Sequence, residues 1–418
     1  MSIGKRVKKM INRNIPKIRF KEFINNWNNY KLGQLGNFKS GIGFPDSQQG
    51  GTEGIPFFKV SDMNNIGNET EMRNANNYVT QEQIMKNSWK VINETPAIIF
   101  AKVGAALMLN RKRLVTRPFL IDNNTMSYSF DESWDKDFGL TLFQTINLPK
   151  YAQIGALPSY NASDIAMIKV NVPNVQEQSA IGSLFRTLDD LLASYKDNLA
   201  NYQSLKATML SKMFPKTGQT VPEIRLDGFE DEWELLEIND LADDFQSGGT
   251  PKTNVQEYWD GDIPWIQSSD LETNCLFEIK VQKSISEKGL KNSSAKIIPK
   301  DSIAVVTRVG VGKLAVMRHE YATSQDFLSL SNLKSNIEFT AYLLYRLLQK
   351  EVTQLQGTSI KGITKVELLS KKVLIPSLPE QQAIGAYFSN LDQLITSYQE
   401  KITQLETLKK KLLQDMFI

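Results

Sequence analysis

Apolar residues recur at alternating steps of three and four in two long stretches of the chain, one central and one terminal. The central stretch opens after Pro173 and runs to about Phe214, where Pro215 and Gly218 end it. The terminal stretch opens after Pro379 and runs to the last residue. This spacing predicts two long helices, each with an apolar seam of the coiled-coil type.

The two predicted seams match each other position by position. We expect the central seam to comprise Ile181, Leu184, Leu188, Leu191, Tyr195, Asn198, Tyr202, Leu205 and Met209. We expect the terminal seam to comprise Ile384, Tyr387, Leu391, Leu394, Tyr398, Lys401, Leu405, Leu408 and Leu412. A second apolar row runs beside them, formed by Phe185, Leu192, Leu199, Phe388, Ile395 and Ile402. The apolar face is thus wider than a two-stranded seam needs, so the extra row packs either against this chain's own domains or against a partner protein.

Helices of this length would be rods of about 55 Å, because an α-helix rises 1.5 Å per residue. Since one helix is internal and the other terminal, and their seams are alike, they most simply pack antiparallel. Such rods are longer than one turn of duplex DNA, about 34–36 Å. We therefore expect a spacer that holds one globular domain at each end, with the two domains related by a pseudo-two-fold axis.

Outside the helices, short apolar runs alternate with turns rich in Gly, Pro and Asn. The runs at 97–101 and 302–306 predict buried strands, and those at 140–146 and 340–350 predict helices, so the fold class is mixed α/β. We expect a first globular domain over 1–172, a central helix over 173–218, a second domain over 219–375 and a terminal helix over 376–418.

One half of the chain repeats the other. The opening motif of the first half returns in the second half, where Pro222, Arg225, Leu226, Phe229 and Trp233 correspond to Pro16, Arg19, Phe20, Phe23 and Trp27. A second motif follows in both halves, as Ile55-Pro-Phe57 with Ser61-Asp62 and as Ile263-Pro-Trp265 with Ser269-Asp270. The helix starts agree best, with Glu177-Gln-x-Ala-Ile-Gly182 returning as Glu380-Gln-x-Ala-Ile-Gly385. A repeat of about half the chain indicates a duplicated domain and not a solenoid. The helical ends stayed alike while the middles diverged, as expected if the ends share one partner and the middles meet different ligands.

Composition and charge narrow the class of protein. The chain has 418 residues, 41% of them hydrophobic, and a formal net charge of +3. Two domains are the natural expectation at this length. No run approaches the roughly 20 apolar residues of a membrane span, and no apolar signal core follows the basic N-terminus, so we expect a cytoplasmic location and no membrane partner. A DNA-binding protein with so small a net charge must segregate its positive residues onto one face.

The chain has one cysteine, Cys275, and one histidine, His319. An intrachain disulfide and a cysteine-based zinc site are thereby excluded. Arg318 and Glu320 beside His319 are typical of an ordinary charged surface, which argues against a catalytic triad there.

Positive and small polar residues gather in the predicted loops of both repeats. Arg and Lys suit phosphates and guanine edges, and Ser and Gln can reach base edges. In the first repeat the candidate DNA contacts are Lys59, Ser61, Lys102, Arg111, Lys112, Arg113 and Tyr160. In the second they are Gln267, Ser268, Arg308, Lys313, Ser359 and Lys361. Lys102 and Arg308 take equivalent places in the repeat, each just before a glycine. For any one of these residues a solvated charged surface is the likelier interpretation, but the set, present in two domains, favours DNA binding.

Catalytic patterns are missing or incomplete. No Asn/Asp-Pro-Pro-aromatic motif for amino methylation is present. Phe38–Gly43 lacks the strand–helix frame of a cofactor loop and indicates a turn, and Gly310–Lys313 lacks the spacing and the Ser/Thr of a phosphate-binding loop. Asp270 with Glu278 and Lys280 has the residue types of a metal-dependent nuclease site, but the first repeat has Asp62, Glu71 and Arg73 there, and Arg is a poor substitute for the lysine.

These motifs together resemble the specificity (S) subunits of type I restriction–modification enzymes. The resemblance covers nearly the whole chain and is carried by the paired Pro-x-Ile-Arg openings, the Ile-Pro-aromatic segments and the Glu-Gln-x-Ala-Ile-Gly helix starts. It implies that each globular part is a target recognition domain that reads one half of a split, non-palindromic DNA site. It also implies that the helices set the gap between the half-sites and dock two methylation subunits, which two restriction subunits join.

The resemblance further implies that this chain holds no catalytic residue, metal or cofactor. S-adenosylmethionine, ATP and Mg are then expected on the partner subunits. Two other hypotheses remain open from the sequence: a self-contained nuclease or methylase, and a scaffold that joins proteins without reading DNA.

Overall fold

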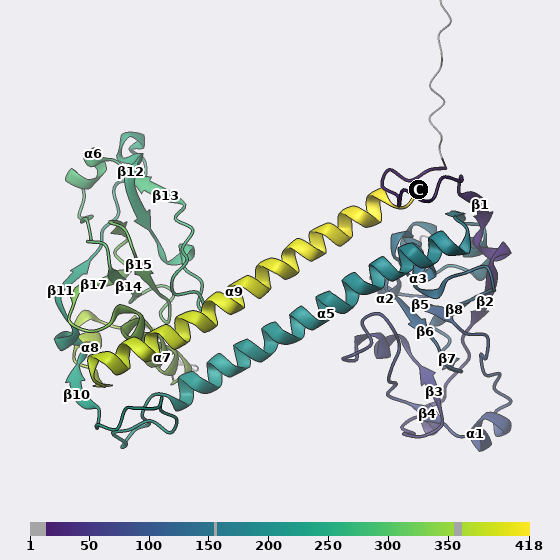
Figure 1. Ribbon diagram of the computed structural model, residues 1–418, viewed down its shortest axis with the longest axis horizontal. Coiled ribbons are helices and arrows are strands. Elements are labelled where there is room, and N and C mark those ends of the chain that lie inside the picture. Colours follow the sequence, from purple (N-terminus) through teal and green to yellow (C-terminus); the bar gives the residue numbers. More distant parts are fainter. Residues whose placement is uncertain (1–13, 154–156, 355–361) are drawn as a thin grey trace, which may run out of the picture. The chain divides into compact units, whose positions relative to one another are not determined.

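The computed structural model describes residues 14–153, 157–354 and 362–418, which form two compact units (Figure 1). The first unit runs to Tyr195 and also includes Lys401–Ile418, and the second unit is Lys196–Glu400. The boundary falls inside both long helices, so each unit contains a part of each. None of the helices in the described part of the chain is long and apolar enough to cross a membrane.

The first unit contains nine strands and several short helices among its described residues. The strands are β1 (Asn28–Lys31), β2 (Gly36–Ser40), β3 (Ile55–Phe58), β4 (Tyr78–Val79), β5 (Ala97–Ala101), β6 (Lys112–Val115), β7 (Leu120–Ile121), β8 (Thr125–Phe130) and β9 (Lys169–Val172). The α-helices besides the long ones are α1 (Gln81–Lys86), α2 (Ala105–Met108), α3 (Lys136–Thr145) and α4 (Ala162–Ala166). The 3-10 helices are η1 (Leu32–Gln34), η2 (Asp46–Gln48), η3 (Val60–Asn64) and η4 (Leu148–Tyr151).

The second unit repeats this plan. Its strands are β10 (Glu234–Glu237), β11 (Ala242–Ser247), β12 (Trp259–Ile266), β13 (Lys283–Ile285), β14 (Ser302–Val306), β15 (Leu314–Met317), β16 (Ala322–Thr323), β17 (Phe327–Leu333) and β18 (Lys372–Ile375). Its helices are α6 (Glu287–Lys291), α7 (Ile337–Gln354) and α8 (Lys365–Leu369), with η5 (Ile238–Leu241), η6 (Gln256–Tyr258) and η7 (Ser268–Asp270). The long helices are α5 (Val175–Lys212) and α9 (Leu378–Asp415).

Each unit holds a four-stranded, a three-stranded and a two-stranded sheet in the same order. The first has β2-β8-β5-β6, β4-β3-β7 and β1-β9, and the second has β11-β17-β14-β15, β13-β12-β16 and β10-β18. In both, the four-stranded sheet is antiparallel, and one strand of the three-stranded sheet pairs in parallel. The predicted repeat and the mixed α/β class are therefore confirmed.

The strand β5 shows how the sheet divides the core. All five of its residues are buried, as the unbroken apolar run predicts. Ile98 and Phe100 pack with α3 on one face, while Ala97 and Ile99 pack with Phe58 on the other. A strand that is covered on both faces reads as continuous apolar sequence, because successive side chains point to opposite sides.

The repeated motifs at the helix starts form a buried ion pair in each unit. Arg19 donates from Nε (2.6 Å) and Nη2 (2.7 Å) to the two carboxylate oxygens of Glu177, and Trp27 Nε1 donates to the same carboxylate at 3.1 Å. In the second unit Arg225 makes the same two-pronged contact with Glu380, at 2.8 and 2.7 Å. Glu177 and Glu380 are each fully buried. The ion pair fixes the start of each long helix against the N-terminal segment of its unit.

The Gln and Gly of the same motif bring each long helix against the shorter helix beside it. Gln178 accepts from the backbone N–H of Asp135 at 2.9 Å, and Gln381 accepts from that of Asn336 at 2.9 Å. A Cβ added at Gly182 would lie 2.5 Å from Asp135 Oδ1, so no other residue lets α5 approach the start of α3 so closely.

The long helices run antiparallel within each unit. In the first unit Lys409 pairs with Asp189, and Lys401 Nζ lies 5.8 Å from the ring centre of Tyr195. In the second unit Lys206 pairs with Asp392, and the rings of Tyr202 and Tyr398 are 5.5 Å apart. In both, the residue number rises along one helix as it falls along the other, which confirms the antiparallel prediction.

The tail of each helix completes the core of the unit it enters. Phe417 packs on Trp27 with ring centres 6.1 Å apart, and Phe214 packs on Trp233 at 6.0 Å. Each unit is thus closed by the end of the helix that began in the other half of the sequence.

The predicted seam is corrected at four of its leucines, and its polar member Lys401 is exposed as well. Ile181, Leu188, Ile384 and Leu391 are buried as expected, and Leu184, Tyr195, Tyr398 and Leu405 are partly buried. Leu191, Leu205, Leu394 and Leu408 instead remain 36–44% exposed. The second row is covered in their place, with Phe185, Leu192, Phe388 and Ile402 buried. A helix turns every 3.6 residues, so a stripe at strict three-four spacing drifts around it, and packing against the domain selects the neighbouring row.

Candidate nucleic-acid interface

In the first unit, four of the predicted DNA contacts gather around the short helix η3. Asp62 fixes the start of this helix, because its carboxylate accepts the backbone N–H groups of Lys59 (2.8 Å) and Asn76 (3.3 Å). Asp62 is fully buried, and desolvation raises its pKa. Lys59 and Ser61 lie in this turn, with Ser61 exposed and Lys59 Nζ donating to Gln49 Oε1 at 3.1 Å.

Arg111 reaches the same helix from the residue before β6, and Arg113 reaches it from β6 itself. Arg111 donates to the side-chain oxygen of Asn64, and Arg113 donates to the carbonyl of Met63 at 3.4 Å. Burial lowers the pKa of Arg113, and its Nε has no hydrogen-bond partner among the described residues. Arg113 therefore contacts η3 from its buried side, while the side chain of Arg111 is partly exposed at the surface.

Two predicted DNA contacts of the first unit are corrected, because they lie in the core. Lys112 is 5% exposed, and its Nζ donates to the carbonyl of Ile146, at the C-terminal end of α3, at 2.5 Å. Tyr160 is 3% exposed, and its hydroxyl donates to the carbonyl of Ala101. Burial lowers the pKa of Lys112 to about 7 and raises that of Tyr160. That a basic residue has other basic residues beside it in the sequence does not tell on which face of the strand its side chain lies.

Lys102 directly follows β5, at the point where the chain contacts the segment around Ser159. The backbone N–H of Tyr160 donates to the carbonyl of Lys102 at 3.3 Å, and that of Gly104 donates to Pro158 at 2.9 Å. The Lys102 side chain is partly exposed. The structure therefore joins the loop after β5 to the segment around Ser159, two stretches that are far apart in the sequence.

The second unit builds a similar cluster around η7. Asp270 accepts the backbone N–H of Gln267 at 3.1 Å, and Lys313 Nζ donates to the carbonyl of Ser268 at 3.3 Å. Gly310, at a φ of +94°, closes the turn over Ser268, where a Cβ would meet the serine side chain at 3.6 Å. Gln267, Ser268 and Lys313 are thus brought together as partly exposed groups.

Arg308 is exposed, on the turn between β14 and β15. The backbone N–H of Ile363 donates to Thr307 at 2.8 Å, and a Cβ at Gly362 would contact Arg308. This turn therefore contacts the segment around Ile363, just as the residues after β5 contact the segment around Ser159 in the first unit. Ser359 and Lys361 lie outside the described residues.

The sheet register corrects one detail of the predicted repeat. Ile98 pairs with Tyr128 and Ile303 with Leu330, and the late segment bonds to Lys102 in the first unit and to Thr307 in the second. Lys102 is thus the counterpart of Thr307, and Arg308 takes the place after it. A match as short as Arg/Lys-Val-Gly cannot reveal that the alignment of the two repeats is shifted by one residue. In a strand, such a shift moves a side chain to the opposite face.

Three of the four carboxylates considered for a nuclease site have structural roles, and the fourth, Glu278, is exposed. Asp62 and Asp270 both cap the start of a 3-10 helix, and Glu71 accepts from the Thr116 hydroxyl at 2.5 Å. Across the ranges 14–153, 157–354 and 362–418, no three His, Cys, Asp or Glu side chains come together as a metal site would require. Gly310–Lys313 lies in a β-hairpin and not before a helix, so it lacks the frame of a phosphate-binding loop.

Exposed apolar residues form a feature that the sequence did not reveal. The four leucines left out of the helix seam lie at repeat-equivalent positions, with Leu191 and Leu408 in the first unit and Leu205 and Leu394 in the second. Met108 and Leu109 in the first unit and Val309 in the second are also exposed, beside the loops described above. Exposure of a loop or helix apolar residue depends on tertiary packing, which no local pattern reports.

Comparisons with known proteins match both halves of the chain. The family model "Type I restriction modification DNA specificity domain" matches residues 24–201 and again residues 230–407. The chain is 29% identical over 194 residues to the type I restriction enzyme MjaIX specificity subunit of Methanocaldococcus jannaschii, covering 45% of this chain and 44% of that protein. It is 28% identical over 191 residues to the EcoR124I/EcoR124II specificity subunit of Escherichia coli, covering 44% of this chain and 46% of that protein. The matched stretches span less than half the length of either relative.

Solved structures share the fold. The S subunit of a type I restriction-modification system from M. genitalium aligns with a TM-score of 0.63 at 15% identity, covering 97% of this chain and 99% of that one. A second structure, from work on complex assembly and conformational transition of the type I R-M system, aligns with a TM-score of 0.51 at 16% identity, covering 93% of this chain and 96% of that one.

Proposed function

This chain belongs to the type I restriction–modification DNA specificity family, and on that premise we propose that it is a non-catalytic subunit that selects the DNA sequence on which partner subunits act. The observation that carries the proposal is the pair of matching frameworks with different loops. The frame of each unit is fixed by the same buried Arg–Glu pair, whereas the polar clusters around η3 and η7 are built from different residues.

Each unit reads its own half-site in this proposal. The first presents Lys59, Ser61, Lys102 and Arg111, and the second presents Gln267, Ser268, Arg308 and Lys313. Since base edges are read by side chains of specific shape and hydrogen-bonding pattern, unlike residue sets select unlike bases. The target is then bipartite and non-palindromic.

The long helices set the gap between the half-sites and dock the partner subunits. Two exposed leucine pairs, Leu191 with Leu408 and Leu205 with Leu394, support two equivalent docking surfaces, because solvent-exposed apolar groups at interfaces gain from burial. Two surfaces suit two methylation subunits, and two restriction subunits join that assembly. S-adenosylmethionine, ATP and Mg are bound by those partners, and the protein works in the cytoplasm, where it meets DNA.

The test is a map of methylated adenines in DNA from cells that contain the partner subunits, with and without this chain. We expect one bipartite sequence to be methylated only when the chain is present. Lengthening α5 and α9 by the same whole number of turns should widen its gap and leave both half-sites unchanged. Leu191→Asp with Leu408→Asp should reduce the methylation without changing the sequence. Methylation that is the same without the chain would contradict the proposal.

A further inference from the structure

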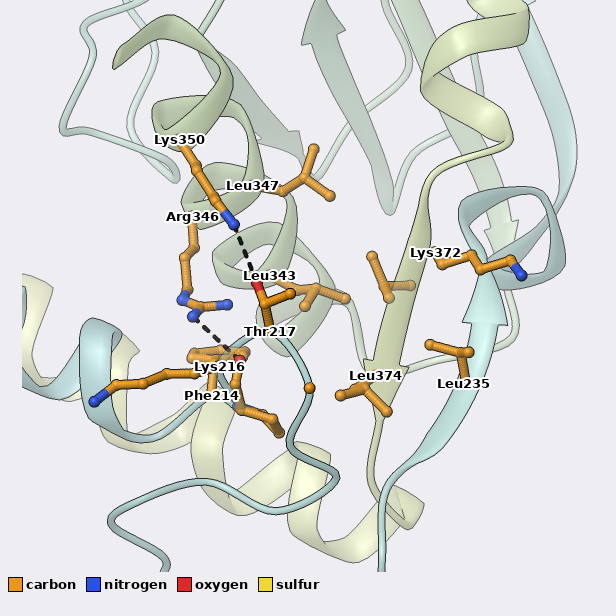
Figure 2. A pocket seen from close by; sticks show the side chains of 13 residues that line it. Phe214, Lys216, Thr217, Leu235, Leu343, Arg346, Leu347, Lys350, Lys372 and Leu374 are labelled. Atoms are coloured by element: carbon orange, nitrogen blue, oxygen red, sulfur yellow. Dashed lines mark hydrogen bonds between the residues drawn. The ribbon is translucent and has the colours of Figure 1, made fainter. Parts of the chain in front are cut away.

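A cavity of about 380 Å³ opens in the second unit beside the end of α5 (Figure 2). Its walls are the turn at 214–218, one face of α7, and the paired strands β10 and β18. Its volume falls in the range of sites for small ligands, roughly 300–1,000 Å³. The DNA-reading role proposed above makes no use of it.

One end of the cavity is cationic. Arg346 and Lys350 come from successive turns of α7 and point toward the turn at 214–218, as Figure 2 shows. Arg346 Nη2 donates to the carbonyl of Pro215 at 3.3 Å, and Lys350 Nζ donates to Thr217 Oγ1 at 3.4 Å. Both contacts are long and are made to neutral oxygens, so each cation keeps donors to offer a ligand.

The positive charge has no carboxylate to balance it there. The thirteen lining residues include four cations, with Lys216 and Lys372 as the other two, and no Asp or Glu. Lys216 is neutralised by Glu223, whereas Arg346 and Lys350 have no acidic partner among the described residues. Burial lowers the pKa of Arg346, which shows that part of its solvation is lost without an anion to replace it.

The rest of the cavity is apolar and partly open to water. Leu343 and Leu347 line it from α7, and Leu235 and Leu374 line it from the directly paired strands. Leu235 remains 58% exposed. Leaving such a side chain in water forgoes the free energy that burial would give, which suggests an apolar occupant.

The first unit differs from the second at the two strand positions that line this cavity. At the two strand positions it has Asn29 and Asn171, which are paired in the same register as Leu235 and Leu374. Asn29 donates to Asn171 Oδ1 at 3.0 Å, and Asn171 donates to the backbone carbonyl of Ile418 at 3.3 Å. In the first unit these two strand positions are therefore polar and satisfied internally, so the leucine pair is particular to the second unit.

We propose that this cavity binds a small amphipathic anion, a single carboxylate or phosphate attached to an apolar chain or ring. The anionic head bonds to Arg346 and Lys350, and the apolar body covers Leu235, Leu374 and Leu347. The first unit does not bind such a ligand.

The experiment measures binding of octanoate, octyl phosphate and octanol to the full chain by isothermal titration calorimetry. These probes share the apolar body and differ in the head group, so a preference between the two anions identifies the head. We expect one or both anions to bind at least about tenfold more tightly than octanol, since a charge-assisted contact is lost with the neutral head.

Two exposed positions are changed so that the fold is kept. Lys350→Gln should weaken anion binding several-fold, and Leu235→Asn, which installs the first unit's residue, should weaken all three probes. The matched control Lys150→Gln, an exposed lysine of the first unit, should leave every affinity unchanged. Equal binding of octanol and the anions, an unchanged affinity in both variants, or no measurable binding would overturn the proposal.

Discussion

At the edge of the four-stranded sheet, Lys112 of the first unit takes the position that Leu314 takes in the second. Lys112 pairs with Phe100 and Leu314 with Val305, in matching registers of equivalent strands. The second unit continues α7 to Gln354, whereas α3 ends at Thr145 and leaves the carbonyl of Ile146 to be satisfied. Asn110 Nδ2 donates to this carbonyl at 3.2 Å, and the Lys112 amine donates to it as well, at the cost of burying a cation.

The buried Arg–Glu pair, by contrast, is the same in both units. The comparison teaches that the contacts which join a long helix to its unit resisted change, while contacts within a unit were free to diverge. This is what the proposed function, a shared frame that carries two unlike reading surfaces, requires.

The largest expected effect is that of Glu177→Ala, which tests whether the frame depends on the buried ion pair. It leaves Arg19 and the Trp27 N–H without their acceptor, and removing one partner of such a pair costs about 3–5 kcal/mol. Glu380→Ala should cost less, because Trp233 Nε1 has no hydrogen-bond partner among the described residues and loses nothing. Denaturant unfolding, followed by hydrogen exchange around each tryptophan, measures both. If both variants lose only a small and equal amount of unfolding free energy, the ion pair is not what anchors the helices.

The next effect is the pH dependence that Lys112 imposes and Leu314 does not. Its pKa is lowered from the ordinary 10.5 to about 7 in the folded chain, so between these values the unfolded chain binds the extra proton. Stability therefore rises with pH through this window, and below pH 7 the folded state bears the full cost of the buried charge.

Lys112→Leu should accordingly be more stable than the parent by about 2 kcal/mol near pH 6, even after the hydrogen bond to Ile146 is lost. That advantage should shrink as the pH rises from about 7 toward 10.5. Unfolding free energies across this range provide the measurement, with the exposed Lys169→Leu as a control. A difference that does not vary with pH would mean that Lys112 is not buried as a costly cation.

The smallest expected effect compares two arginines of the proposed reading surfaces. Arg308 is exposed, whereas Arg111 bonds to Asn64. Arg308→Ala should weaken DNA binding of the assembled complex by about tenfold and lower the salt slope by about one if it contacts a phosphate. Arg111→Ala should weaken binding less, because part of its bonding is spent within the protein. A relaxed base choice at one position would instead assign Arg308 to a base, and unchanged binding would remove it from the interface.

The frame was more predictable than the reading surface, for a physical reason. The helices, the strand Ala97–Ala101 and the repeat follow from periodicity and from local matches, since each depends on neighbours in the sequence. The burial of Lys112 and Tyr160 depends on which face of a strand or turn meets the core, and the one-residue slip at Lys102 depends on sheet register. The exposure of Leu191 likewise depends on which apolar row the domain covers. Such choices are made by tertiary packing, which composition and spacing do not encode.

The central claim, that each unit independently reads one half-site, is tested most directly by making the two units alike. Residues 16–172 are replaced by a second copy of residues 222–375, which retains the Arg225 needed to pair with Glu177. Methylated adenines are then mapped in cells that contain the partner subunits. Because the helices are antiparallel, the account predicts a symmetric target in which the second unit's half-site occurs twice, in opposite orientations. Methylation of the original asymmetric sequence by this chimera would contradict it.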